Sequence, residues 1–291
     1  MIPQIEYVSP RLLPSALKIL NSKNKIIKIL AGGTDIVPGF HIESKRFINT
    51  DVLLDIKRIS TLKKIVERKD SVEIGAAITF SEIIESEIIK KYFPLLVKAA
   101  SQIGSVQIRN RATIVGNFVN NAPCADSVPP LLVYDAKIEI QSLTRKKIIP
   151  LQKFLIKPYH TQLKKNEIVT KIILPKPDVS LMGEFYKLGR RRAASISRIS
   201  LALLLRKKDN IIDEIRIASG AVTPIGTRLY DLEKFAKGKP ATNDTFKELS
   251  QKLGEKVLEI TGLRWSSPYK LPVLQNLFFL LLLEVKNNEK K

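Results

Sequence analysis

The sequence contains very few residues of the kinds that bind metals or form disulfide bonds. Its 291 residues include one cysteine, Cys124, and two histidines, His41 and His160. A single cysteine cannot form an internal disulfide, an iron–sulfur cluster or a thiolate zinc site within this chain, and two histidines make a poor metal site. The sequence therefore predicts either a borrowed cofactor for any redox or hydrolytic chemistry, or a binding protein.

Long apolar runs are also scarce. The longest, Leu277–Leu283, is too short to cross a bilayer, so the sequence predicts no transmembrane helix. The first residues lack the basic flank and apolar stretch of a secretory signal, which predicts a cytoplasmic protein. With 44% apolar and 26% charged residues, the composition is that of a globular chain long enough for two domains.

Acidic residues are few compared with basic ones. The sequence has 28 Asp and Glu and 49 Lys and Arg, which gives a formal net charge of +21. Such an excess raises the hypothesis of nucleic-acid binding. However, the basic residues are spread along the chain, and short clusters such as Lys164-Lys165 fall between apolar segments. A general lysine bias or an anionic partner or ligand explains the charge equally well.

Apolar periodicity and turn residues predict an α+β protein in two parts. One helix is expected to begin near Leu12, with Pro14 in its first turn, and another at Thr79, which has capping-box spacing to Glu82. A proline-rich junction lies at residues 175–177, and one further helix is expected before it, at Leu95–Ile103. Three strands are also expected before this junction, at Ile26–Leu30, Lys137–Leu143 and Glu167–Leu174. Three antiparallel strands are expected after the junction, at Phe185–Leu188, Ile199–Leu205 and Ile211–Ser219. Three helices are expected to follow these strands, at Leu229–Phe235, Asp244–Ile260 and Tyr269–Val285.

A glycine-rich turn follows the first of these strands. Residues 31–35 read AGGTD, in which Gly32 and Gly33 allow positive φ and a close approach of a ligand to the backbone. Consecutive exposed amides in such a turn form a concavity for an anion, and Thr34 can add a hydroxyl donor. The alternative is a plain tight turn, because a single glycine-rich turn is a weak motif.

A second segment, residues 107–117, reads QIRNRATIVGN and continues into a stretch rich in amide side chains. Asp126 or Ser127 is expected to cap a helix that has Pro129 in its first turn. Polar groups such as Asn117 and Asn120 are costly to bury without partners, and a bound ligand could supply them.

These two segments, with NEIVTKIILP at 166–175, FYKLGRRRAASIS at 185–197, GAVTPIGTR at 220–228 and RWSSPYK at 264–270, resemble the FAD-binding medium subunits of molybdenum hydroxylases. This family includes xanthine, carbon monoxide and nicotinate dehydrogenases. The resemblance covers almost the whole chain, in order. One departure is Val115, which stands where the first of two loop glycines is usual; its Cβ could narrow the approach of a phosphate or shift the loop.

The resemblance implies a two-subdomain FAD-binding fold of the vanillyl-alcohol-oxidase (PCMH) type, followed by a three-stranded antiparallel sheet with a helical bundle. The implied domains are 1–177, with subdomains of about 1–55 and 56–177, and 178–291. Carried over by position, the implied FAD contacts are the diphosphate loop Ile29, Leu30, Ala31, Gly32, Gly33, Thr34, Asp35, Ile36 and Val37, the second loop Ala112, Thr113, Ile114, Val115, Gly116 and Asn117, and the separate residues Ile103, Asp126, Ile168, Val169 and Lys187.

The implied function is that of an oxidoreductase flavin subunit without a general base of its own. A large molybdopterin subunit would oxidise the substrate, a small subunit would relay electrons through two [2Fe–2S] clusters, and FAD would pass them to NAD⁺ or another acceptor. The three chains would form a heterotrimer or a dimer of heterotrimers. Three alternatives stay open: a stand-alone flavin oxidoreductase of the same fold, a basic nucleic-acid-binding protein, and an accessory protein that has lost its flavin.

Overall fold

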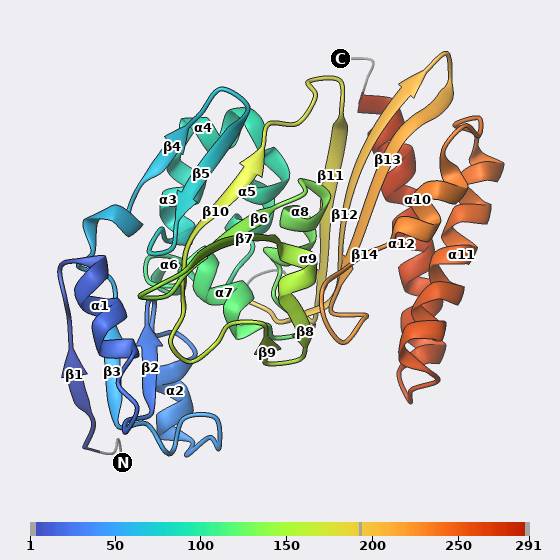
Figure 1. The fold of residues 1–291 in the computed structure, drawn as a ribbon. Coiled ribbons are helices and arrows are strands. Elements are labelled where there is room, and N and C mark those ends of the chain that lie inside the picture. Colours follow the sequence, from blue (N-terminus) through green and yellow to red (C-terminus); the bar gives the residue numbers. More distant parts are fainter. Residues whose placement is uncertain (1–3, 192–193, 289–291) are drawn as a thin grey trace.

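The first layer of the fold is a small parallel sheet at the N-terminus. The computed structural model describes residues 4–191 and 194–288. Strands β1 (Glu6–Val8) and β2 (Ile27–Leu30) flank the central β3 (Val52–Asp55) in the order β1-β3-β2 (Figure 1). Helix α1 (Leu13–Leu20) carries Pro14 in its first turn, as predicted, and α2 (Ile36–His41) follows the glycine-rich turn.

A five-stranded antiparallel sheet forms the second layer, in the order β4-β5-β10-β6-β7. Its strands are β4 (Ile65–Glu67), β5 (Ser71–Gly75), β6 (Lys137–Gln141), β7 (Lys146–Pro150) and β10 (Ile168–Pro175). The chain therefore inserts its last strand, β10, between β5 and β6. Pro175 ends β10 opposite Ser71, one residue beyond the predicted end of that strand.

Short helices connect β5 to β6 and separate this sheet from the C-terminal one. They are α3 (Phe80–Glu85), α4 (Glu87–Tyr92), α5 (Pro94–Ser101), α6 (Val106–Arg109), α7 (Ile114–Asn120) and α8 (Val128–Val133). The predicted capping box of α3 is present, with Thr79 accepting from the Glu82 amide and Glu82 accepting from the Thr79 amide. Between β3 and β4 lies the short helix η1 (Ser60–Leu62), and between β7 and β10 lie α9 (Leu151–Phe154), β8 (Leu155–Lys157) and β9 (His160–Thr161).

The C-terminal part is an antiparallel sheet with helices on one face. Strands β11 (Met182–Gly189), β12 (Ser197–Lys208) and β13 (Ile211–Gly220) confirm the three predicted strands. A two-residue strand, β14 (Thr227–Arg228), adds a fourth that the sequence did not predict. The predicted helices are also confirmed, as α10 (Tyr230–Ala236), α11 (Asn243–Thr261) and α12 (Ser267–Asn288).

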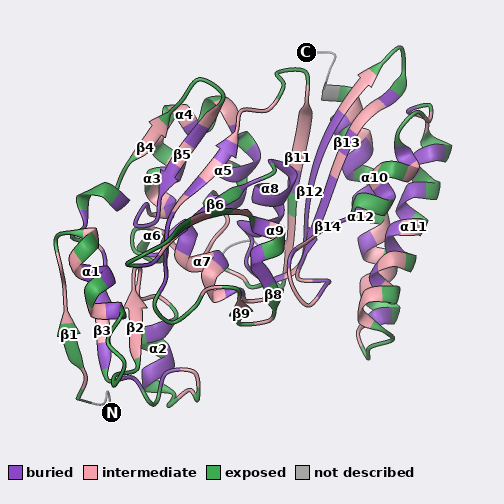
Figure 2. Cartoon of the chain, viewed as in Figure 1, coloured by how far each residue is buried: buried purple, intermediate pink, exposed green. Residues whose placement is uncertain are grey.

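Both faces of the C-terminal sheet are buried. Leu201 and Leu203 of β12 belong to one apolar cluster with residues of α10–α12. Ala202 and Leu204 belong instead to the apolar cluster of the N-terminal half, and β12 contacts α8 as well as α12. Figure 2 shows this burial along β12 and β13 and the exposed outer surfaces of the helices. Because the two halves share a core, the domain boundary at residue 177 stays a prediction.

Helix α12 is long and apolar enough to cross a membrane by length and composition alone. Its Leu274, Phe278 and Leu282 are fully buried against the C-terminal sheet and α11. One face of α12 thus packs into the core, and other apolar side chains of the helix stay exposed, including Leu280 at 51% exposure.

Candidate functional site

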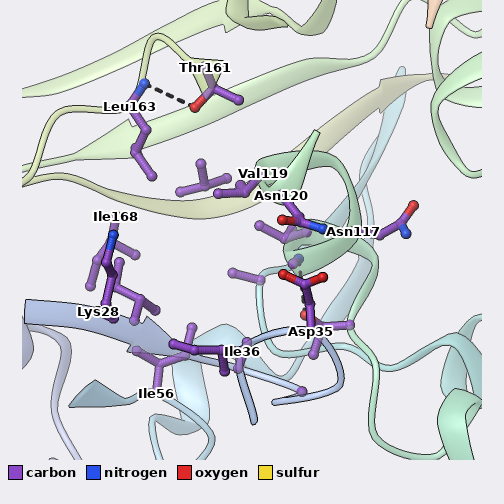
Figure 3. Close-up of a pocket in the computed structure, with 18 of the residues that line it drawn as sticks. Lys28, Asp35, Ile36, Ile56, Asn117, Val119, Asn120, Thr161, Leu163 and Ile168 are labelled. Atoms are coloured by element: carbon purple, nitrogen blue, oxygen red, sulfur yellow. Dashed lines mark hydrogen bonds between the residues drawn. The ribbon is translucent and has the colours of Figure 1, made fainter. Parts of the chain in front are cut away.

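A cavity of about 440 Å³ lies between the parallel sheet, helix α7 and the segment that leads into β10 (Figure 3). This volume is within the range of about 300–1,000 Å³ that ligand pockets occupy. In Figure 3, Lys28, Ile36 and Ile56 line one wall, Asn117 and Asn120 of α7 lie opposite, and Thr161 and Leu163 close a third side.

Two adjacent glycines shape the turn at the end of β2. Gly33 has a φ of +78°, a backbone conformation that residues with a Cβ rarely adopt. A Cβ on Gly32 would lie 2.4 Å from the Arg111 carbonyl oxygen and 2.7 Å from the Ala112 Cα. The turn therefore packs directly against the backbone of the second sequence segment, so the two segments predicted from sequence meet at one cavity.

The amides of this turn are free. Within the described chain, the N–H groups of Gly32, Gly33 and Thr34 donate to no acceptor, although they lie in a turn that borders the cavity. Consecutive unbonded amides are the groups from which protein backbones build anion sites, and charge-assisted hydrogen bonds of this type contribute about 1.5–3 kcal/mol each. The expectation of an anion-binding turn thus has a physical basis in the geometry.

The second segment differs from the expected loop. Residues from Ile114 onward form α7, and Thr113 caps that helix by accepting from the Gly116 amide at 3.1 Å. The Ile114 amide already donates to the Ile78 carbonyl. Val115, which departs from the family pattern, is buried in the first turn of α7 and lines the cavity.

Four cations and two carboxylates line the cavity. Arg46 donates to Asp35 at 2.9 Å and to the Asn120 side chain, and its guanidinium stacks on the ring of Tyr159 at 4.4 Å. The other carboxylate, Glu167, is held by Lys147 at 2.9 Å and by the Lys164 amide. Both negative charges are therefore already compensated by the protein.

Lys28 and Lys165 add positive charge, and neither forms a salt bridge with a carboxylate of the described residues. Burial lowers the pKa of the Lys28 ammonium, and the nearby charges of Arg46 and Lys165 lower it further. No side chain among the described residues donates to or accepts from Lys28. An anion in the cavity would relieve this repulsion. The sequence shows Lys164-Lys165 only as a short basic cluster between apolar segments, and nothing in it singles out Lys28 or Arg46.

Most of the residues implied by the resemblance line this cavity. They are Ile29, Ala31, Gly32, Gly33, Thr34, Asp35, Ile36, Ala112, Thr113, Val115, Gly116, Asn117, Ile168 and Val169. The remaining six do not. Leu30 and Val37 pack around Gly33, and Ile114 is fully buried.

Asp126 and Lys187 form a separate buried centre where the C-terminal sheet meets the helices before it. The carboxylate and ammonium are 2.7 Å apart, with side chains only 5% and 6% exposed. Lys187 also donates to the carbonyl of Gln102, the neighbour of Ile103, and Ser197 donates to Asp126. Burial raises the pKa of Asp126, against the opposing effects of Lys187 and Ser197.

This arrangement corrects the predicted cap of α8. Ser127 is the N-cap residue by position, but it forms no side-chain cap and instead donates to Asn117 at 2.7 Å. Asp126 is occupied by Lys187. Burial raises the pKa of the Cys124 thiol, and the Asp126 charge raises it further, which favours an unreactive thiol. Arg192 and Ala193 of the FYKLGRRRAASIS segment lie outside the described residues.

Comparison with known proteins gives matches along nearly the whole chain. The sequence model described as "FAD binding domain in molybdopterin dehydrogenase" matches residues 3–177, and "CO dehydrogenase flavoprotein C-terminal domain" matches residues 184–285. The xanthine dehydrogenase FAD-binding subunit of Escherichia coli O157:H7 is 33% identical, over 91% of this chain and 90% of that protein. The glyceraldehyde dehydrogenase medium chain of Sulfolobus acidocaldarius is 31% identical, over 94% and 95%.

The fold has matches among solved structures as well. A chain in the structure of carbon monoxide dehydrogenase from Hydrogenophaga pseudoflava superposes with a TM-score of 0.90 at 26% identity, covering 98% of each chain. The α+β, PCMH-type architecture predicted from the sequence is therefore confirmed.

Proposed function

This chain belongs to the family of FAD-binding subunits of molybdenum hydroxylases, and from that membership we propose that it is the electron-transfer subunit of such an assembly. It would take electrons from the [2Fe–2S] clusters of a small subunit, and a large subunit would hold the molybdopterin and oxidise the substrate. NAD⁺ or another acceptor would receive the electrons. FAD supplies the chemistry by accepting electrons singly and releasing them as a pair.

The observation that carries the proposal is the row of unbonded amides in the turn of residues 32–34, which borders the cavity. The residues present fit FAD, because the free amides of residues 32–34 suit a diphosphate and the uncompensated charge of Lys28 and Lys165 favours an anionic ligand. Apolar side chains such as Ile29 and Val169 also line the cavity and suit ring systems.

The protein's own residues bind and orient the cofactor. The amides of residues 32–34 would hold the diphosphate, and Arg46 would keep the cavity walls together, because it contacts Asp35 of the turn, Asn120 of α7 and Tyr159 before β9. Val115 would place a methyl-bearing wall beside the cofactor. Asp126 and Lys187, which lie outside the cavity wall, are proposed as contacts at the far end of the cofactor on the strength of the resemblance alone.

An absorbance spectrum of the purified chain tests the proposal. We expect flavin bands, release of FAD and not FMN on denaturation, and recovery of a large molybdopterin chain and a cysteine-rich small chain on co-purification. A colourless protein that takes up no added FAD would contradict the proposed function. Retention of nucleic acid at moderate salt by such a colourless protein would favour the nucleic-acid alternative.

A further inference from the structure

A surface of mixed cationic and apolar side chains lies at the turn between α11 and α12. We call it the 263–270 surface, and it consists of Arg198, Leu263, Arg264, Trp265, Tyr269 and Lys270. Trp265, the one tryptophan in the sequence, is 89% exposed, and Leu263 is 83% exposed. Single exposed apolar residues are ordinary, but a tryptophan beside an exposed leucine and several cations is the composition of a binding surface.

The cations of this surface have no carboxylate. Among the described residues, the side chains of Arg198 and Arg264 form no hydrogen bond or salt bridge, and Lys270 donates only to the Ala221 carbonyl, at 3.3 Å. Other arginines of the same sheet differ, because Arg206 and Arg228 each bind at least two carboxylates.

The three cations also repel one another. Burial lowers the pKa of the Lys270 ammonium, and the charges of Arg198 and Arg264 lower it further. Placing three cations together without a counter-charge is unfavourable in the isolated chain, and a partner that brings carboxylates to this place would offset that cost.

The surface adjoins the junction of the two halves of the molecule. Arg198 follows Ser197, which donates to the buried Asp126, and Ala221 donates its amide to the Pro123 carbonyl. A partner seated here would therefore lie beside the segment that contains Asp126.

We propose that the 263–270 surface docks a carboxylate-rich surface of a partner polypeptide, with Trp265 as the apolar anchor and Arg198, Arg264 and Lys270 as the ion-pairing groups. This inference rests on the proposed function, since it names the surface by which this chain joins its assembly. The excess of +21 charges on this chain favours an acidic partner in the same way.

The test measures binding of the FAD-loaded chain to the purified remainder of its assembly, the molybdopterin and iron–sulfur subunits. The double variant Arg198→Glu/Arg264→Glu and the variant Trp265→Ala should each weaken binding by at least about tenfold, as truncation of hot-spot residues does. The double variant should also lose most of the salt dependence of binding. The FAD content of every variant should equal that of the unaltered chain, because these residues lie outside the cavity.

Matched controls separate this effect from a change in overall charge. Lys247→Glu reverses an exposed cation on α11 that has no partner among the described side chains, and Ile42→Ala removes an apolar side chain that is 78% exposed. Both should bind as the unaltered chain does. Equal loss of binding in Lys247→Glu would show a general charge effect and would overturn the proposal.

Three other outcomes also overturn it. One is unchanged affinity in both surface variants, and the others are a change confined to self-association or to nucleic-acid retention. If instead the unaltered chain holds no FAD and binds no partner, the proposed function itself fails. A yellow chain that binds its partners and is insensitive to these substitutions refutes only the docking surface.

Discussion

At the scale of single residues, the two glycines of the turn serve different physical needs. Gly32 is required by the close approach of the Arg111 and Ala112 backbone, whereas Gly33 is required by its positive φ. Neither requirement involves a cofactor. The free amides result from the turn that these glycines permit, so backbone packing alone shapes this side of the cavity.

Substitution of Gly33 by valine tests the turn. A β-branched residue at a φ of +78° is strained, and its Cβ would lie 3.3 Å from the Leu30 Cδ1. We expect FAD affinity to fall by a factor of roughly ten to a hundred, because displacement of one charge-assisted hydrogen bond costs about 1.5–3 kcal/mol. Titration of the apoprotein with FAD, followed by fluorescence, measures the change.

The matched control is Gly238→Val. Gly238 has a φ of +83° and open space around its Cβ position, so this variant imposes the same backbone strain away from the cavity. It should lose a similar amount of stability and keep its FAD affinity. Normal FAD binding by Gly33→Val would show that the turn has been assigned wrongly.

The sequence allowed prediction of the turn but not of the cations around it. Glycines in a strand–turn context are informative individually, because few other residues adopt these conformations. Lys28 and Arg46 are two of 49 basic residues, and nothing in their neighbourhood in the sequence distinguishes them. The role of Arg46 depends on Tyr159 and Asn120, which the fold brings to it from distant segments.

At the scale of elements, local signals were reliable where a cap or a proline supplied them. The capping box at Thr79 and the proline in the first turn of α1 each predict where a helix begins, and the structure has a helix beginning at both places. Helix α7 was missed, because Thr113 caps it without the acidic partner that marks a capping box. Strand β14 was missed because two residues carry no periodicity.

The five-stranded sheet carries an ion-pair network across three of its strands. Lys171 of β10 binds Glu73 of β5 at 3.0 Å and lies 3.6 Å from Glu139 of β6, whose carboxylate also accepts from Thr170 at 2.7 Å. Burial raises the pKa of each glutamate, but hydrogen bonds and the charge of Lys171 outweigh burial and lower both pKa values overall.

Replacement of Lys171 by methionine should therefore change the acid stability of the protein. A lowered carboxyl pKa adds stability above the ordinary glutamate value of about 4.3, and that stability is lost as the pH falls through the folded-state pKa. We expect Lys171→Met to be less stable by about 1–2 kcal/mol at pH 7. Urea unfolding at several pH values should show this gap closing below about pH 4.

Lys137→Met is the control on the same sheet. Lys137 is exposed on β6, and its side chain has no partner in the part of the chain that the structure describes. Its replacement should change stability by less than about 0.5 kcal/mol at any pH. A gap for Lys171→Met that persists unchanged at acid pH would mean that lost packing, not charge, causes it.

At the scale of the whole molecule, a buried ion pair fastens the C-terminal sheet to the rest of the chain. Asp126 and Lys187 stand 61 positions apart and meet where apolar residues of both halves form one core. The fold class could be predicted because the strand and helix patterns are strong. The ion pair itself was not predicted, because long-range ion pairs leave no local pattern; the resemblance implied Asp126 and Lys187 only as two separate cofactor contacts.

A double-mutant cycle tests the pair. Lys187→Met alone should destabilise the apoprotein by about 3–5 kcal/mol, because it leaves a buried carboxylate without its counter-charge. The double variant Lys187→Met/Asp126→Asn should recover a large part of that loss. Urea unfolding measures both, and FAD titration of the double variant then tests whether these residues also contact the cofactor.

The exposed pair Lys239–Glu248, at 3.1 Å, provides the comparison cycle. Its coupling should stay below about 1 kcal/mol, as is usual for solvated ion pairs. A loss in the double variant equal to the sum of the losses in Lys187→Met and Asp126→Asn alone would show that the two charges are independent.

The position of β10 has a consequence for synthesis of the protein. Residues 168 and 169, which begin this central strand, also form one side of the cavity, so the pocket is incomplete until the ribosome has released them. Strands β5 and β6 both pair with β10, so the five-stranded sheet cannot form until β10 has been synthesised. A nascent chain truncated before β10 would thus present an open apolar edge to chaperones, and flavin loading would be a late event in biogenesis.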